Sequence, residues 1–171
     1  MSPSRAPTLI LGPSEGGSVQ IGGLAARFMV DGETSGGGFA LVDHPIAPRS
    51  LAAPMHVHER EDEYSYVVEG EVGFQVGDQV VVGRPGDLAF KPRGVWHAFW
   101  NPGDAPARLL EIISPAGFER YFEELAPLLG GQGPPDLQAV QELQSRYRLT
   151  MDMGSVERLV TEHGLRPQPF E

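Results

Sequence analysis

Two histidines separated by a single residue, His56 and His58, carry the clearest chemical signal in the sequence. Side chains of a β-strand alternate between its two faces, so both imidazoles would point to the same side. Two imidazoles on one face can share a metal ion when a carboxylate or a third histidine reaches the same point from another part of the chain. The pair therefore predicts half of a metal site.

Three acidic residues follow this pair closely: Glu61, Asp62 and Glu63. On an unbroken strand, Asp62 would share the face of the histidines and Glu63 would not. The charged run that starts at Glu59 is typical of a turn or a bulge, however, and either one would reset the alternation. Alternation alone leaves the choice of carboxylate open.

A third histidine, His97, follows a turn that contains Pro92 and Gly94 and opens an apolar run. Its neighbours in that run include two tryptophans, a valine and a phenylalanine, so a polar side chain there needs a reason to be present. His44 lies before Pro45 in a predicted loop, and His163 lies near the end of a predicted helix. Neither is assigned to the metal site.

The elements that must position these residues are short strands. Between residues 21 and 117, apolar runs alternate with turns rich in glycine and proline, which is typical of a β-sandwich or a barrel. The single lysine, Lys91, is interpreted as a turn residue. The predicted strands are Ala26–Val30, Gly38–Val42, Tyr64–Val68, Val72–Val76, Gln79–Val82, Asp87–Phe90, Trp96–Trp100 and Arg108–Ile113.

The 171 residues suggest one domain, organised in three stretches. Residues 1–20 are rich in proline, glycine and serine and predict a flexible arm or an edge strand. Residues 21–117 form the predicted barrel. Residues 118–171 change to a helical period and are expected to pack on the barrel or on a dimer partner.

Local signals mark the helices of this last stretch. A stripe of apolar residues from Phe118 to Leu125 predicts a first helix that ends at Pro127. Asp136 is a suitable N-cap for a second helix. A third helix is predicted from Ser155 to His163, with Gly164 as its stop signal.

Composition excludes several classes of function. The chain has 13 basic and 23 acidic residues, a net charge of −10, which argues against binding to nucleic acid or to an anionic membrane surface. It has no cysteine, and therefore no disulfide and no thiolate ligand. No apolar run is long enough to span a membrane, and the N-terminus lacks the features of a signal peptide, so we expect a cytoplasmic protein.

The histidine regions resemble the two sequence motifs of the cupin superfamily. In the first motif, four residues separate His58 from Glu63, and six more separate Glu63 from Gly70. Ser50 stands where the family usually has a glycine. The second motif is complete and consists of Gly86, Pro92, Gly94, His97 and Asn101. The resemblance extends over residues 38–114 and is closest to single-domain bacterial cupins of the quercetin 2,3-dioxygenase-like group.

This resemblance implies an all-β fold, a cupin-type β-barrel or jelly roll with a C-terminal helical extension. It also implies one divalent transition metal ion, which could be Fe, Mn, Ni, Co, Cu or Zn. The implied ligands are His56, His58, Glu63 and His97, with Glu63 also acting in catalysis. Asp62 is the alternative carboxylate.

Alternation around these ligands predicts the rest of the site. If Glu63 and His97 face inward, their strands contribute an apolar, aromatic substrate pocket. The predicted pocket residues are Ser65, Val67, Phe74, Phe90 and Phe99, with Phe39 as a further candidate. Outward-pointing aromatic residues would be covered by the C-terminal helices or by a second subunit; these are Tyr64, Tyr66, Trp96 and Trp100.

The resulting functional expectation is a metal-dependent dioxygenase that acts on a small aromatic or enolisable substrate with O2. An alternative is a non-redox isomerase, cyclase or decarboxylase in which the ion acts as a Lewis acid. A cupin that binds a small molecule without turnover is the third possibility. A homodimer is expected in each case.

Overall fold

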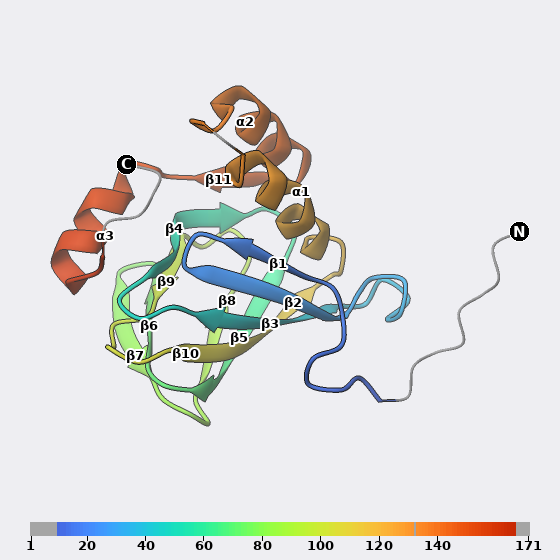
Figure 1. The fold of residues 1–171 in the computed structure, drawn as a ribbon, viewed down its shortest axis with the longest axis horizontal. Coiled ribbons are helices and arrows are strands. Elements are labelled where there is room, and N and C mark those ends of the chain that lie inside the picture. Colours follow the sequence, from blue (N-terminus) through green and yellow to red (C-terminus); the bar gives the residue numbers. More distant parts are fainter. Residues whose placement is uncertain (1–9, 132, 167–171) are drawn as a thin grey trace, which may run out of the picture.

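Eleven strands within residues 10–131 and 133–166, the part of the chain that this computed structural model describes, form two antiparallel sheets (Figure 1). The six-stranded sheet contains, in spatial order, β1 (Ser18–Ile21), β2 (Leu24–Val30), β3 (Ala40–Ile46), β10 (Ala107–Ser114), β5 (Asp62–Glu69) and β8 (Leu88–Lys91). The five-stranded sheet contains β11 (Leu149–Met151), β4 (Leu51–His58), β9 (His97–Trp100), β6 (Val72–Val76) and β7 (Gln79–Gly83).

The core between the sheets follows from the alternation of side chains along each strand. On β10, Leu109 and Ile113 are fully buried, whereas the intervening Ile112 is partly exposed. Leu109 packs in one apolar cluster with Phe74 and Phe99, which come from the opposite sheet. The two inner faces therefore meet directly and hold the sheets together.

One tight turn between β5 and β6 requires a glycine. Gly70 has a φ of +71°, and a Cβ atom there would lie 2.8 Å from the carbonyl oxygen of Pro106. Any other residue would be strained and would also collide with this backbone. The turn returns the chain from one sheet to the other directly after the strand that carries Glu63.

Each of the eight predicted strands overlaps a strand of the structure, although β3 is displaced to Ala40–Ile46. No sequence signal predicts β11, which is three residues long and pairs with β4 opposite His56 and His58. Within the predicted N-terminal arm, residues 18–21 form the edge strand β1. Residues 1–9 of that arm lie outside the described residues.

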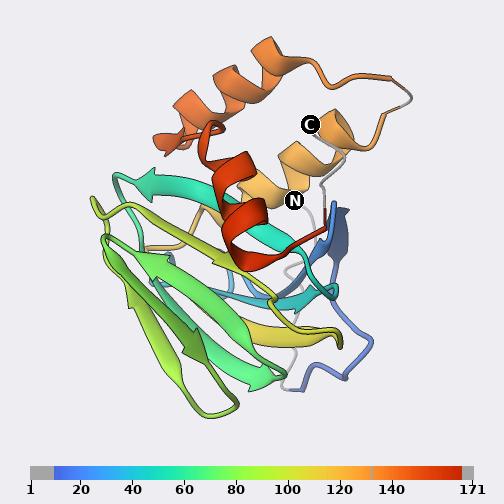
Figure 2. The ribbon, with the colours of Figure 1, turned by 90° about the vertical axis from the view of Figure 1, so that its left-hand side faces the viewer.

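Three helices lie together on one side of the sheets: α1 (Glu119–Leu129), α2 (Leu137–Arg146) and α3 (Ser155–His163) (Figure 2). The predicted cap is confirmed, because the Asp136 side chain accepts hydrogen bonds from two backbone N–H groups of the first turn of α2. The predicted bounds of α3 are confirmed as well, and Gly164 ends it in the left-handed conformation. None of the described helices is long and apolar enough to cross a membrane.

The prediction that Pro127 ends the first helix is wrong, because α1 continues to Leu129. A proline inside a helix removes one backbone hydrogen bond and strains the preceding turn. Leu128 and Leu129 pack against the apolar cluster that α1 shares with the sheets, and this burial offsets the local cost.

The outward-pointing aromatic residues differ in how they are covered. The Trp100 ring is buried under α3 and stacks on His163 at a centroid distance of 4.0 Å, which confirms the expected cover by a C-terminal helix. Tyr64 stacks on Phe90 at 4.8 Å on the outer face of the six-stranded sheet. Tyr66 and Trp96 are 45% and 39% exposed, and their coverage by a second subunit stays a prediction.

Candidate metal centre

The structure brings His56, His58, Glu63 and His97 together in the interior, although they come from both sheets. His56 and His58 lie on β4, and the register of β4 with β9 places His97 directly opposite His56. Glu63 faces them from β5 of the other sheet. All four side chains are buried, and one nitrogen or oxygen atom from each lies within 4.8 Å of the others.

The three neighbouring acidic residues point in three different directions. Residues 59–61 separate β4 from β5, so the alternation restarts at Asp62 and turns Glu63 inward. Asp62 points outward and forms an ion pair with Arg93, at 2.8 Å between Oδ2 and Nη2. Glu61 lies behind the ring of His58, with 3.5 Å between Oε2 and Nδ1. Only Glu63 of these three faces the histidine cluster.

Backbone carbonyl groups determine which nitrogen of two of these rings carries the proton. The Nδ1 atom of His56 lies 2.8 Å from the Pro54 oxygen, and that of His97 lies 2.9 Å from the Val95 oxygen. Because a carbonyl only accepts hydrogen bonds, both Nδ1 atoms must donate. In the neutral rings Nε2 is therefore unprotonated and free to bind a metal ion.

This protonation pattern leaves two electron pairs facing each other. The Nε2 atom of His97 lies 3.1 Å from Oε2 of Glu63, and neither atom has a proton when the imidazole is neutral and the carboxylate ionised. A cation between them removes the repulsion. Metal–nitrogen and metal–oxygen distances are about 2.0–2.2 Å, so two atoms 3.1 Å apart are close enough to bind one ion together.

His58 provides independent support for a metal. Both of its ring nitrogens are buried, and neither has a hydrogen-bond partner among the described residues. Its Nε2 lies 3.4 Å from Oε1 of Glu63. Buried polar atoms without a partner are costly and therefore rare. A bound ion would satisfy Nε2, while the Glu61 carboxylate lies 3.5 Å from Nδ1.

The protonation states of the cluster also suit a metal ion. Burial lowers the pKa of His56 well below its usual value, and burial also lowers that of His97, so both rings are neutral. Burial alone would raise the pKa of Glu63, but the charge of Lys91 opposes it, and that pKa lies well below its usual value. His56, His97 and Glu63 are therefore in their ligating forms.

Lys91 is not a turn residue, and that prediction is wrong. It is the last residue of β8, pairs in register with Glu63, and its side chain is fully buried. Its Nζ lies 2.9 Å from Oε2 of Glu63 and 3.0 Å from Oε2 of Glu111, which also accepts a hydrogen bond from Ser65. Lys91 therefore links two buried carboxyl groups.

Sequence reasoning missed Glu111, although the alternation along β10 could have revealed it. Glu111 takes the inward position between Leu109 and Ile113, where an acidic side chain is unexpected. Burial, together with the charge of Glu63, raises the pKa of Glu111 to about 7 despite the opposing charge of Lys91. Its Oε1 atom is buried without a partner among the described residues.

A cavity of about 440 Å³ opens next to the cluster, and His56, His58 and Glu63 form part of its wall. Of the predicted pocket residues, only Phe99 lines it. Ser65, Val67 and Phe74 point inward, as predicted, but lie in the packed interior away from this wall. Phe90 is paired with Tyr64 and shares its outward face, so it is 49% exposed and lies outside the cavity, as does the exposed Phe39.

The part of the wall that was not predicted comes mainly from the C-terminal stretch. Phe118 and Phe122 close the cavity from the start of α1, while Leu149 and Met151 of β11 lie along its rim. His44 of β3 also lines it; it is fully buried, and burial lowers its pKa to about 4. The helical residues missed by strand alternation are visible only once the helices are docked on the sheets.

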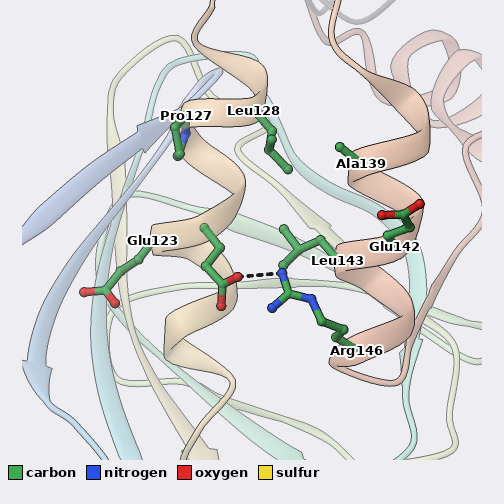
Figure 3. A pocket seen from close by; sticks show the side chains of 8 residues that line it. Glu123, Pro127, Leu128, Ala139, Glu142, Leu143 and Arg146 are labelled. Carbon is green, nitrogen blue, oxygen red and sulfur yellow. Dashed lines mark hydrogen bonds and ion pairs between the residues drawn. The ribbon is translucent and has the colours of Figure 1, made fainter.

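A second hollow lies between α1 and α2, away from the cluster (Figure 3). The ion pair between Glu124 and Arg146 crosses it at 2.6 Å. Its wall combines exposed acidic residues with leucine, alanine and proline and contains no histidine. It has none of the features of the metal centre.

Comparison with known proteins identifies the fold. Residues 44–113 match the family model of the cupin domain. Similar solved structures include KdgF from Halomonas sp. (TM-score 0.59, 16% identity, 67% of this chain and 99% of that one). They also include a predicted oxalate decarboxylase from Thermotoga maritima (TM-score 0.59, 22% identity, 63% of this chain and 99% of that one). A third is an RmlC-like cupin from Shewanella frigidimarina (TM-score 0.55, 24% identity, 64% of this chain and 93% of that one). A search of curated proteins gave no match. The cupin fold with a C-terminal helical extension is confirmed.

The link formed by Lys91 predicts a large loss of stability when it is removed. Lys91→Met leaves Glu63 and Glu111 buried without their shared cation, which should lower the free energy of unfolding by about 3–5 kcal/mol. Urea unfolding of the metal-free protein measures this change. Adding Glu111→Gln to Lys91→Met should restore part of the loss, because a neutral amide removes the cost of burying or protonating the Glu111 carboxyl group. A Lys91→Met variant as stable as the parent would contradict the role of this link.

The buried His44 predicts sensitivity to acid. The unfolded chain takes up a proton near pH 6.5 that the folded chain accepts only near pH 4, so stability falls as the pH falls through this window. In His44→Asn, an amide can still donate to the backbone but no charge can form. Between pH 7 and pH 5, the parent should lose about 2 kcal/mol more than this variant in urea unfolding. Identical pH dependence in both proteins would show that His44 titrates normally.

Proposed function

We propose that the protein is a metal-dependent oxidoreductase of the dioxygenase type that acts on a small aromatic or enolisable substrate. The observation that carries this proposal is the position of the histidine–glutamate cluster in the wall of a largely apolar cavity. An ion held by this cluster would be within reach of an organic molecule in the cavity. A purely structural ion has no need of such access.

The donor set suits a transition metal. His56, His58, Glu63 and His97 would hold one divalent ion, and ligands of this type accept Fe, Mn, Ni, Co, Cu or Zn. When bound, the ion would polarise a substrate oxygen as a Lewis acid and could also take up O2.

The residues of the chain have separable roles in this proposal. Glu63 is the proposed base, since its Oε atoms can take the proton from a substrate hydroxyl group or an acidic C–H group. Lys91 keeps that carboxylate ionised through its contact at 2.9 Å. Phe99, Phe118 and Phe122 give the cavity an aromatic wall that excludes water and favours a flat ring. The sequence resemblance to the quercetin 2,3-dioxygenase-like group points to the same class of substrate.

A second candidate function rests on the pair Glu63 and Glu111. Their pKa values are driven apart, with Glu63 ionised and Glu111 raised to about 7, and such a pair can supply a base and an acid for the same reaction. This favours a non-redox proton transfer, as in an isomerase, a cyclase or a decarboxylase. The same four ligands would hold the ion, and no O2 would be consumed.

The dioxygenase proposal predicts oxygen consumption. Metal-free protein should be reconstituted in parallel with each of the six candidate ions and supplied with flavonols and other enolisable aromatic compounds. At least one combination should consume about one O2 per substrate, as measured with an oxygen electrode and by chromatography. Glu63→Gln should lower the rate per bound ion at least about 100-fold, because the base is removed.

Asp62→Asn is the matched control, since Asp62 points outward to Arg93 and should leave most of the activity intact. Conversion of a substrate without O2 uptake would overturn the dioxygenase proposal in favour of the non-redox candidate. Binding without any conversion would leave a small-molecule binding cupin.

A further inference from the structure

His44 is one of the polar residues of the cavity for which the proposed metal chemistry has no role, together with Tyr121, Gln141 and Gln144. It lies on β3, on the inner face of the six-stranded sheet, and only 1% of the residue is exposed. Two aromatic rings flank it, with centroid distances of 5.2 Å to Phe122 and 6.4 Å to Phe99. A histidine thus occupies a position in an aromatic wall where an apolar side chain would pack at lower cost.

One hydrogen bond defines the orientation of this ring. Its Nδ1 atom lies 2.8 Å from the carbonyl oxygen of Ala25 on the neighbouring strand β2. The carbonyl can only accept, so Nδ1 carries the proton, and in the neutral ring Nε2 carries a free electron pair. The two nitrogens lie on different edges of the imidazole. Because the Nδ1 edge faces β2 and the ring lines the cavity, the Nε2 edge is the one presented to the cavity.

No described residue donates a hydrogen bond to this Nε2 atom. Unlike Oε1 of Glu111 and the hydroxyl oxygen of Tyr121, which are fully buried without a partner among the described residues, this Nε2 atom keeps some accessible surface, so a ligand or water in the cavity can supply the donor. The cavity is the place from which such a donor can come. His44 is therefore poised to accept a hydrogen bond from a molecule bound there.

The other wall residues restrict the chemistry of that molecule. Along the described wall of the cavity there is no lysine or arginine, whereas Glu63 and Glu111 both contribute carboxyl groups. A phosphate or carboxylate group would find no cationic side chain there and would be repelled by these acids. Most of the remaining wall is aliphatic or aromatic. These features favour an uncharged, flat, apolar molecule with a hydrogen-bond donor.

We propose that Nε2 of His44 accepts a hydrogen bond from a phenolic or enolic hydroxyl group of the substrate, so that His44 selects hydroxylated aromatic compounds over their ethers. This inference rests on the proposed function, because it assigns the substrate class of the same cavity. The Phe99 ring of the opposite sheet contacts both His44, at 6.4 Å between ring centroids, and Lys91, whose Nζ lies 4.8 Å from the ring centroid. His44 thus orients the substrate from the same six-stranded sheet that carries Glu63, Lys91 and Glu111.

The test compares two probes of nearly the same shape, 2-naphthol and 2-methoxynaphthalene, of which only the first can donate a hydrogen bond. Binding is measured by fluorescence titration of the metal-free protein, so that it depends neither on a bound ion nor on turnover. The parent should bind 2-naphthol about five- to tenfold more tightly than the ether, the preference expected for one hydrogen bond.

Three variants separate recognition from packing. His44→Asn keeps a donor for the Ala25 carbonyl and removes the acceptor from the cavity, so the preference should vanish. His44→Gln can place an amide oxygen near the position of Nε2 and should retain part of the preference for 2-naphthol. His163→Asn makes the same change on the ring that stacks on Trp100, outside the cavity, and should keep the full preference.

Equal binding of both probes by the parent, no binding of either, or an unchanged preference in His44→Asn would each overturn the inference. Nitrogen-15 spectra of the parent add a readout that needs no variant, since the Nε2 resonance of His44 should move on addition of 2-naphthol and remain in place with the ether. A protein that shows this preference but consumes no O2 would retain the substrate class and lose the dioxygenase function. A protein that consumes O2 but binds both probes equally would retain the dioxygenase function and lose the proposed substrate class.

Discussion

The Glu63 carboxylate is buried between the two sheets, with imidazole nitrogens on one side and the Lys91 ammonium group on the other. Each of these contacts depends on the others. Without Lys91, burial would favour the protonated acid, which is a poor metal ligand. Without a cation at the histidines, electron pairs of Glu63 and His97 would face each other at 3.1 Å. The interior is therefore organised around one ionised carboxylate that two positive charges can share.

The chemistry and the selectivity of the site come from different parts of the chain. All four candidate ligands lie within residues 44–113, which match the cupin domain. Much of the aromatic and aliphatic wall of the cavity comes from α1, α2 and β11, beyond these residues. A cupin fold can host many reactions, so under the proposed function we expect this added wall to select the substrate. This division explains why the family resemblance indicates the site more closely than the substrate.

The sequence predicted those features that depend on short-range spacing. The separation of His56 and His58 determines a common face, and a charged run after them correctly predicts the end of their strand. Features that depend on the pairing of distant strands were less accessible. Lys91 follows an apolar run and precedes Pro92, so it looks like a turn residue until β8 is paired with β5 opposite Glu63. Phe90 was assigned to the wrong face for the same reason, and β11 is too short to leave a periodic signal.

The most direct test of the metal centre is the metal content per chain of protein purified without a His tag, measured by elemental mass spectrometry beside His97→Ala. The structure predicts close to one divalent transition ion per chain in the parent, and loss of most of it in the variant while the fold survives. Absence of metal from the parent even after reconstitution, or full retention in His97→Ala, would contradict the central claim that this cluster binds a metal ion.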